Sequence, residues 1–402
     1  MLKTKLIVFW GESLVNLIKP LIVIYFINKH FDVNIYGNIV LFNLILSIAN
    51  NIFNLKVPSY LVKIFNQKNS FENFINNLNS LLLQFGLVLF LTGGVVIYFL
   101  NLGYSYLLID LILIIIILTK PLRGIMIVSK KLNHMGIILI GCKISFIILF
   151  LFSLLQKTTE FLNTYLVLLL IENLLLFIFL FWSCNSIIKF RFQKIQFSVL
   201  SDFFRYILSF FGINLLKSIL KEIDKLIITY AFDREVLGMY DIGKKLFLPL
   251  KILVSPFNSI FLKGISEKLL LEKNIEYLKK KIIKIEFFMT LFFILNLSSI
   301  IISYEFLKFN FEFDLLSIFS ICCIGVIVFF ESLLWWPQII TTQIRRNFAF
   351  INLSIKTFVT ITIIPLLLYF YGLQGLIFAM ILGKLFSYAF WRFYVLNNKF
   401  LL

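Results

Sequence analysis

The chain has 402 residues, 60% of them hydrophobic, and a mean hydropathy of +0.98. About half of a soluble globular protein is apolar, so these values exclude a soluble globular protein and indicate an integral membrane protein. The net charge of +18 does not indicate a nucleic-acid-binding protein, because the basic residues alternate from loop to loop instead of gathering in one soluble segment.

About twelve predominantly apolar segments follow one another along the chain, each long enough to cross the hydrocarbon core as a helix. We therefore predict an all-α integral membrane protein with about 12 transmembrane helices. The expected helices are 6–27, 36–56, 78–99, 107–128, 135–155, 163–183, 206–232, 236–260, 284–304, 314–336, 348–370 and 374–396.

The connections between these segments fall into two alternating classes. One class is rich in lysine and arginine, as at Lys130 and Lys131, whereas the other carries only Lys29, Lys157, Arg234 and Lys308. Basic loops stay on the cytoplasmic side, so we expect a multi-pass protein of the bacterial cytoplasmic membrane with both termini in the cytoplasm. The poorly charged outward loops are short, roughly five to ten residues, which argues against a membrane glycosyltransferase or polymerase that works at the outer face.

A short repeat divides the chain in half. "FDVNIYG" at 31–37 and "FDREVLG" at 232–238 share Phe, Asp and Gly at the same spacing, and both occupy the outward turn after the first expected helix of a half. We predict two six-helix lobes of the same orientation, 1–200 and 201–402, around a central cavity in which cargo binds.

Lysines recur at membrane depth, where a charge is costly unless it faces water or a protein interior. At a rise of 1.5 Å per residue, four of them fall within about two turns of the bilayer midplane. Compact point charges in a wet cavity suit a diphosphate, although pairing with a neighbouring acid or snorkelling is the alternative for each lysine. The candidates for substrate binding are Lys19, Lys217, Lys221 and Lys251.

Five acids lie in the expected helices and are candidates for ion coupling or for charge pairing with lysine. They are Glu12, Asp224, Asp241, Glu172 and Glu331. We expect Lys225 to pair with Asp224 or Glu222, and Lys244 to pair with Asp241. The four cysteines and two histidines show no metal-ligand spacing, and no GxxxxGK[ST] loop is present. No metal, cofactor or enzymatic activity is expected.

The stretch 261–283 is basic and amphipathic, which favours contact with anionic lipids of the inner leaflet. A plain topology signal explains the same charges equally well.

The segment 213–266 resembles the opening of the second half of Wzx-type O-antigen flippases, a polysaccharide-biosynthesis family within the multidrug/oligosaccharidyl-lipid/polysaccharide exporter superfamily. These flippases have an Asp followed by a basic residue near the end of span 7, Gly-x-Tyr at the start of span 8, and a Pro and a Ser near its inward end. The first half echoes this pattern with Tyr36-Gly37 and Pro58. The matching residues of the second half are Asp224, Lys225, Gly238, Tyr240, Pro256 and Ser266.

The resemblance implies two six-helix lobes around a V-shaped cavity. It implies transfer of undecaprenyl-diphosphate-linked oligosaccharides to the outer leaflet by alternating access, for lipopolysaccharide O-antigen or capsule. Implied partners are this lipid-linked substrate, a polysaccharide polymerase and a chain-length regulator. Family members often carry arginines in the cavity, whereas this chain has mostly lysines there, which keep the point charge but lose bidentate geometry.

Four other functions remain as alternatives to the flippase interpretation. A cation-coupled multidrug or small-molecule antiporter of the same superfamily would need an acidic or aromatic cavity, and the lysine excess argues against it. A peptidoglycan-precursor flippase usually has two further C-terminal spans. A membrane glycosyltransferase or polymerase would need a long outward loop. A major-facilitator transporter would carry Gly-x-x-x-Asp-Arg after span 2, which is missing from the loop beginning at Leu55.

Overall fold

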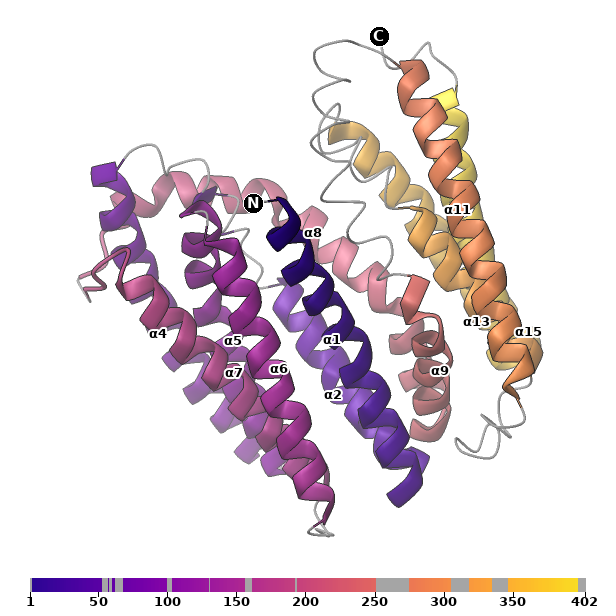
Figure 1. The fold of residues 1–402 in the computed structure, drawn as a ribbon, viewed down its shortest axis with the longest axis horizontal. Helices are drawn as coiled ribbons and strands as arrows, with labels where there is room; N and C mark the ends of the chain where they lie inside the picture. Colours follow the sequence, from indigo (N-terminus) through magenta and orange to yellow (C-terminus); the bar gives the residue numbers. More distant parts are fainter. Residues whose placement is uncertain are drawn as a thin grey trace. The chain divides into compact units, whose positions relative to one another are not determined.

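The computed structural model describes residues 2–52, 57, 60–61, 68–99, 103–129, 131–155, 161–191, 194–250, 275–304, 318–334 and 346–396. These residues form α-helices and short connections, with no β-strand among them. The predicted all-α fold is therefore confirmed (Figure 1).

Each of the expected membrane helices has a helical counterpart in the described residues. Up to the chain midpoint these are α1 (Leu2–His30), α2 (Val33–Ile52), α4 (Lys68–Phe99), α5 (Tyr104–Val128), α6 (Leu132–Leu155), α7 (Phe161–Asn185) and α8 (Phe197–Ala231). They are followed by α9 (Arg234–Leu246), α11 (Ile275–Ile302), α13 (Ile318–Leu333) and α15 (Arg346–Leu396).

Two helix boundaries differ between the expected and the observed elements. Gly372 has φ 56° and ψ −135°, a conformation that only glycine adopts readily, so α15 is two helices joined at a break. This break lies where the sequence separates 348–370 from 374–396. The expected helix 236–260 is described only in its first part, because residues 251–274 lie outside the description.

Long apolar helices dominate the described part of the chain. Eight of its helices are long and apolar enough to cross a membrane, among them 104–128 and 161–185. The chain is therefore a multi-pass membrane protein.

The chain divides into two compact units. The first comprises Met1–Lys19 and Leu41–Ile219, and the second comprises Pro20–Val40 and Leu220–Leu402. The second half of α1 and the first part of α2 thus belong with the C-terminal helices. The predicted division into lobes 1–200 and 201–402 stays a prediction.

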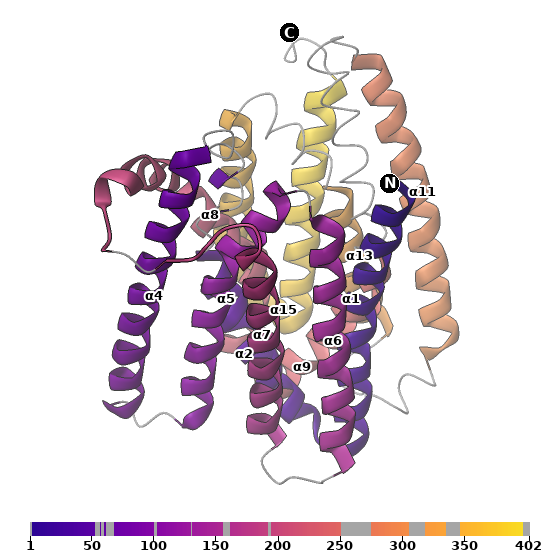
Figure 2. The same cartoon turned by 60° about the vertical axis from the view of Figure 1, so that its left-hand side comes forward.

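In the first unit, α4, α5, α6 and α7 run side by side, with α5 and α7 in the most extensive contact (Figures 1 and 2). Aromatic rings fill the space between α6 and α7. Phe146 and Phe150 are fully buried, and the centroid of Phe146 lies 5.8 Å from that of Tyr165. Interlocked rings of this kind hold the helix pair in one rotation.

In the second unit, α13 packs against α9, α11 and α15. The ring of Phe247, which follows α9, rests on Gly325 of α13: a Cβ at Gly325 would lie 2.4 Å from Cζ of that ring. Only glycine permits so close an approach. The contact fixes the end of α9, the helix that supplies much of the candidate site.

Candidate functional site

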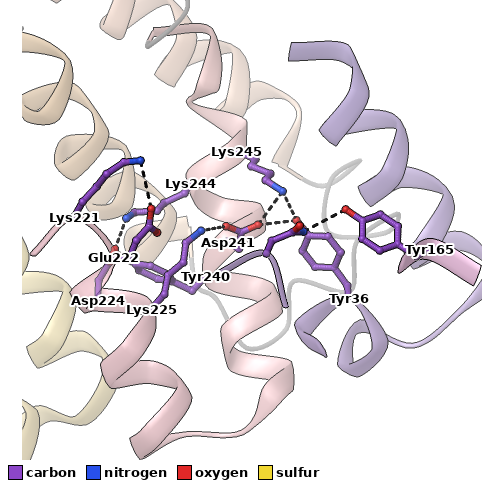
Figure 3. A network of polar contacts seen from close by, with 11 residues as sticks. Tyr36, Tyr165, Lys221, Glu222, Asp224, Lys225, Tyr240, Asp241, Lys244 and Lys245 are labelled. Carbon is purple, nitrogen blue, oxygen red and sulfur yellow. Dashed lines mark hydrogen bonds and ion pairs between the residues drawn. The ribbon is translucent and has the colours of Figure 1, made fainter. Parts of the chain in front are cut away.

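A network of buried charges lies in the second unit, where α8, α9 and the first turn of α2 meet (Figure 3). Its two carboxylates are almost inaccessible, since Asp224 is 0% and Asp241 2% exposed. Asp241 comes from α9, whose two ends carry local helix signals. Asp233 takes an extended conformation immediately before α9, Glu235 lies in its first turn and lysines lie in its last, which suits the helix dipole.

Asp241 on α9 accepts contacts from three different elements. Lys225 Nζ of α8 lies 2.6 Å from Asp241 Oδ1, and Lys245 Nζ, one turn further along α9, lies 3.0 Å from Oδ2. The hydroxyl of Tyr36 on α2 donates a hydrogen bond of 2.7 Å to the same Oδ2. Lys245 Nζ also donates to the Tyr36 oxygen at 2.8 Å. This carboxylate therefore joins α2, α8 and α9.

Asp224 on α8 has a second set of partners. It forms an ion pair with Lys244 of α9, and the hydroxyl of Tyr240 donates a hydrogen bond of 2.6 Å to its Oδ2. Tyr240 itself is fully buried. Two helices are thus joined by two crossed ion pairs, one at each aspartate (Figure 3).

The predicted partners are exchanged in the structure. Lys225 pairs with Asp241 instead of Asp224 or Glu222, and Lys244 pairs with Asp224 instead of Asp241. Consecutive residues on a helix point about 100° apart, so the side chains of Asp224 and Lys225 do not face each other. Each instead meets the opposite charge on the neighbouring helix.

The network has more cations than anions among its core members. Three lysines, at 225, 244 and 245, face two aspartates, at 224 and 241, which leaves a formal charge of 3 − 2 = +1. Removing either partner of such a buried pair leaves an uncompensated charge, which costs about 3–5 kcal/mol. The network therefore holds α8 and α9 in one register.

Lys221, a predicted substrate ligand, lies one turn before Lys225 on α8 and outside the core of the network. Its side chain is 68% exposed, compared with 11% for Glu222, and its Nζ lies 3.4 Å from Glu222 Oε1 (Figure 3). The side chains of two further predicted ligands are not described. Lys251 lies outside the described residues, and of Lys217 only the helical backbone is described.

Lys19, the fourth predicted ligand, belongs to a separate cluster in the first unit. It forms an ion pair with Glu172 of α7, and its Nζ lies 3.8 Å from the centroid of the Phe146 ring. A cation over an aromatic face gains further electrostatic stabilisation. Nearby, Lys143 donates to the side-chain oxygen of Asn16 and lies 4.0 Å from Glu12 Oε1.

All five acids named as candidates for coupling or charge pairing have a lysine partner. Besides the pairs above, Glu331 Oε1 of α13 lies 2.9 Å from Lys384 Nζ of α15. Whether any of the five couples transport to an ion stays a prediction. Among the described residues, no group of three or more His, Cys, Asp or Glu side chains is arranged to hold a metal ion.

Glu286 of α11 is an intramembrane acid that sequence reasoning missed. It is 7% exposed, accepts a hydrogen bond of 2.6 Å from the Tyr388 hydroxyl and lies 3.6 Å from Arg392 Nη2. The sequence signal that could have identified Glu286 is its position inside an apolar run. Tyr36 and Tyr240 were singled out only as motif residues, and their bonds to the two buried aspartates depend on helix packing.

Comparisons with solved structures show where this fold occurs elsewhere. The lipid II flippase MurJ in an inward closed conformation has 14% identity and a TM-score of 0.66, over 98% of this chain and 87% of that chain. A multidrug resistance MATE family transporter of the MOP superfamily, in an inward-facing conformation, has 12% identity and a TM-score of 0.65, over 96% and 94%. A mutant of the Vibrio cholerae MATE transporter VcmN has 10% identity and a TM-score of 0.64, over 99% and 98%.

At these identities the likeness concerns the fold alone. No curated protein matches the chain at a significant level. The family model described as "Polysaccharide biosynthesis protein" matches residues 33–311, more than half of the chain. The chain therefore belongs to the polysaccharide biosynthesis protein family.

Proposed function

We propose that the chain is a flippase that moves undecaprenyl-diphosphate-linked oligosaccharide units across the bacterial cytoplasmic membrane, for a surface polysaccharide such as O-antigen or capsule. The observation that carries this proposal is the family match over residues 33–311. The fold that the chain shares with a lipid II flippase and with MATE transporters supports transport over glycosyl transfer or polymerisation.

In this mechanism the diphosphate enters an inward-open cavity, where Lys19, Lys217, Lys221 and Lys251 hold it. The exposure of Lys221 supports its part, because a mobile ammonium group can reach an anion without breaking the buried network. Lys19 would release Glu172 when the diphosphate binds. The glycan occupies the wet cavity, the prenyl tail remains in lipid, and a rocking motion of the lobes exposes the head group outward.

The topology expected from the loop charges places both termini in the cytoplasm. The partners of the flippase would be its lipid-linked substrate, anionic membrane lipids, and the polysaccharide polymerase with its chain-length regulator. No nucleic acid takes part. The driving force would come from an ion gradient, the membrane potential or consumption of the product.

A second candidate function is cation-coupled export of drugs or other small molecules. The fold that the chain shares with MATE transporters favours it. The lysines at membrane depth oppose it, because organic cations would be repelled by a positively charged cavity.

The deciding experiment is deletion of the gene, followed by mass spectrometry of lipid-linked saccharides and measurement of surface polysaccharide. A flippase predicts loss of surface polymer together with accumulation of complete, unpolymerised units on undecaprenyl diphosphate, shielded from reagents outside the cell. Re-expression of the chain should reverse both effects. Intact surface polymer together with new sensitivity to cationic drugs would overturn the proposal and support the exporter.

A further inference from the structure

A cavity of about 380 Å³ lies in the first unit, at the start of α6 and the end of α7. None of its described lining residues belongs to the charge clusters described above or to the predicted substrate ligands. The described residues that line it are Lys131, His134, Trp182, Ser183, Asn185 and Ser186.

The lining is rich in hydrogen-bond donors. His134 Nε2 lies 3.2 Å from Ser183 Oγ, and Lys131 Nζ donates to Ser186 Oγ over a long 3.4 Å. The ammonium of the exposed Lys131 can make three hydrogen bonds, so this weak contact leaves donors available. A lysine, an imidazole, two hydroxyls and an amide, with no carboxylate among the described lining residues, form a suitable environment for a phosphate group.

The depth of the cavity in the membrane follows from the helices around it. It lies at the ends of two apolar stretches, 132–154 and 161–185, that are long enough to cross a bilayer. Trp182 is 75% exposed, and an indole at the end of a membrane helix marks the headgroup level. The cavity therefore lies at the boundary between hydrocarbon and water.

The segment after α7 folds back along that helix. The rings of Phe181 and Phe190 stack with centroids 4.9 Å apart, which returns residues 186–190 toward α7. Lys189 and Arg191 are exposed at this end. The connection before α6 and the connection after α7 are both rich in basic residues. This is the feature from which we predicted that they lie on the inward side of the membrane.

We infer that this cavity binds the phosphate headgroup of an anionic phospholipid from the inward leaflet. Lys131 provides the charge, and the Ser183–His134 pair and the Asn185 amide provide hydrogen bonds to the phosphate oxygens. The hydroxyl of Ser186 already donates to the Ser183 carbonyl oxygen at 2.8 Å. The acyl chains would lie along the exposed apolar surface of α7, where Ile178 is 54% exposed and Trp182 covers the transition to the headgroup. Basic pockets between membrane helices on the cytoplasmic side are suited to anionic headgroups. The inference does not depend on the identity of the transported substrate.

The test compares two lysines that carry the same charge at the same end of the first unit. Lys131 lines the cavity, whereas Lys189 is exposed and is not among its described lining residues. Full-length wild-type protein and the variants Lys131→Gln and Lys189→Gln are purified in detergent. Phosphatidylglycerol, phosphatidylcholine and undecaprenyl phosphate are then titrated by native mass spectrometry, and the melting temperature is followed with each lipid.

Phosphatidylglycerol should bind wild type and Lys189→Gln alike and raise their melting temperatures, while phosphatidylcholine should do neither. Lys131→Gln should bind phosphatidylglycerol about fivefold more weakly, the loss expected for one lysine at a membrane surface. Ser183→Ala, which keeps the charge, should weaken binding to a smaller extent. Equal losses in the two lysine variants would show unspecific charge attraction and overturn the inference. Unchanged binding by Lys131→Gln, or binding of undecaprenyl phosphate alone, would also overturn it.

Discussion

Gly37 of α2 and Gly238 of α9, which hold the same place in the two copies of the sequence repeat, lie against each other in the second unit. A Cβ on Gly238 would be 3.1 Å from the Gly37 nitrogen, and a Cβ on Gly37 would be 1.9 Å from the carbonyl oxygen of Arg234. The two helix starts therefore touch backbone to backbone, a contact that requires small residues. The same close approach brings Tyr36 within hydrogen-bond distance of Asp241.

Replacing Gly37 by alanine should destabilise the protein. The new methyl group would collide with backbone at Arg234, and overpacking of this kind costs about 1–3 kcal/mol. The apparent melting temperature and the folded yield in detergent should both fall. Gly141→Ala is the matched control: apart from the adjoining stretch of α6 itself, no described atom lies within 4 Å of its Cβ position, so that variant should be neutral or slightly stabilised. Equal behaviour of the two variants would refute the close contact.

The intact ion pair between Lys244 and Asp224 should add little to the free energy of unfolding, whereas removal of one partner alone should lower it strongly. Lys244→Met leaves a fully buried carboxylate without its cation, at a cost of about 3–5 kcal/mol, so little folded protein should remain. The double variant Lys244→Met/Asp224→Asn should recover most of the folded yield, because the asparagine side chain would still accept the Tyr240 hydrogen bond. Size-exclusion profiles of tagged protein measure this. A double variant as unstable as the single one would contradict a specific pairing.

Two lysines one turn apart on α8 should separate function from stability. Lys221 is 68% exposed, whereas Lys225 is 20% exposed and lies 2.6 Å from Asp241 Oδ1. Lys221→Glu should abolish transfer of lipid-linked oligosaccharide, measured as surface polymer, while the amount of folded protein stays unchanged. Lys225→Ala should chiefly lower the folded yield. Normal surface polymer in cells that carry only Lys221→Glu would rule out the diphosphate role of this lysine.

Lys19 can be tested by removing its charge together with that of its partner. Lys19→Gln alone should lower stability, because Glu172 is then left as a carboxylate that is 9% exposed and has lost its lysine. Adding Glu172→Gln should restore stability, since two amides can hydrogen-bond to each other. If Lys19 binds the diphosphate, surface polymer should remain absent in the stable double variant. Recovery of polymer there would mean that the lysine serves only the ion pair.

The periodicity and composition of the sequence were sufficient to predict the helices of this fold. Apolar runs of membrane-spanning length predict the described membrane helices, and the division between the runs 348–370 and 374–396 coincides with the break at Gly372. Such features are local: a run of apolar residues and a residue that tolerates positive φ act on their own stretch of chain.

The sequence by itself determined that the protein is an all-α membrane protein and that its long apolar segments carry both lysines and acids. Only the tertiary structure decided which lysine meets which acid, as the exchanged partners of Asp224 and Asp241 show. Pairing depends on how two helices are rotated about their axes, and a rotation of about 100° replaces one side chain by its neighbour. That rotation is set by packing between distant residues, such as Gly37 on Gly238 and Phe247 on Gly325, which no local pattern reveals.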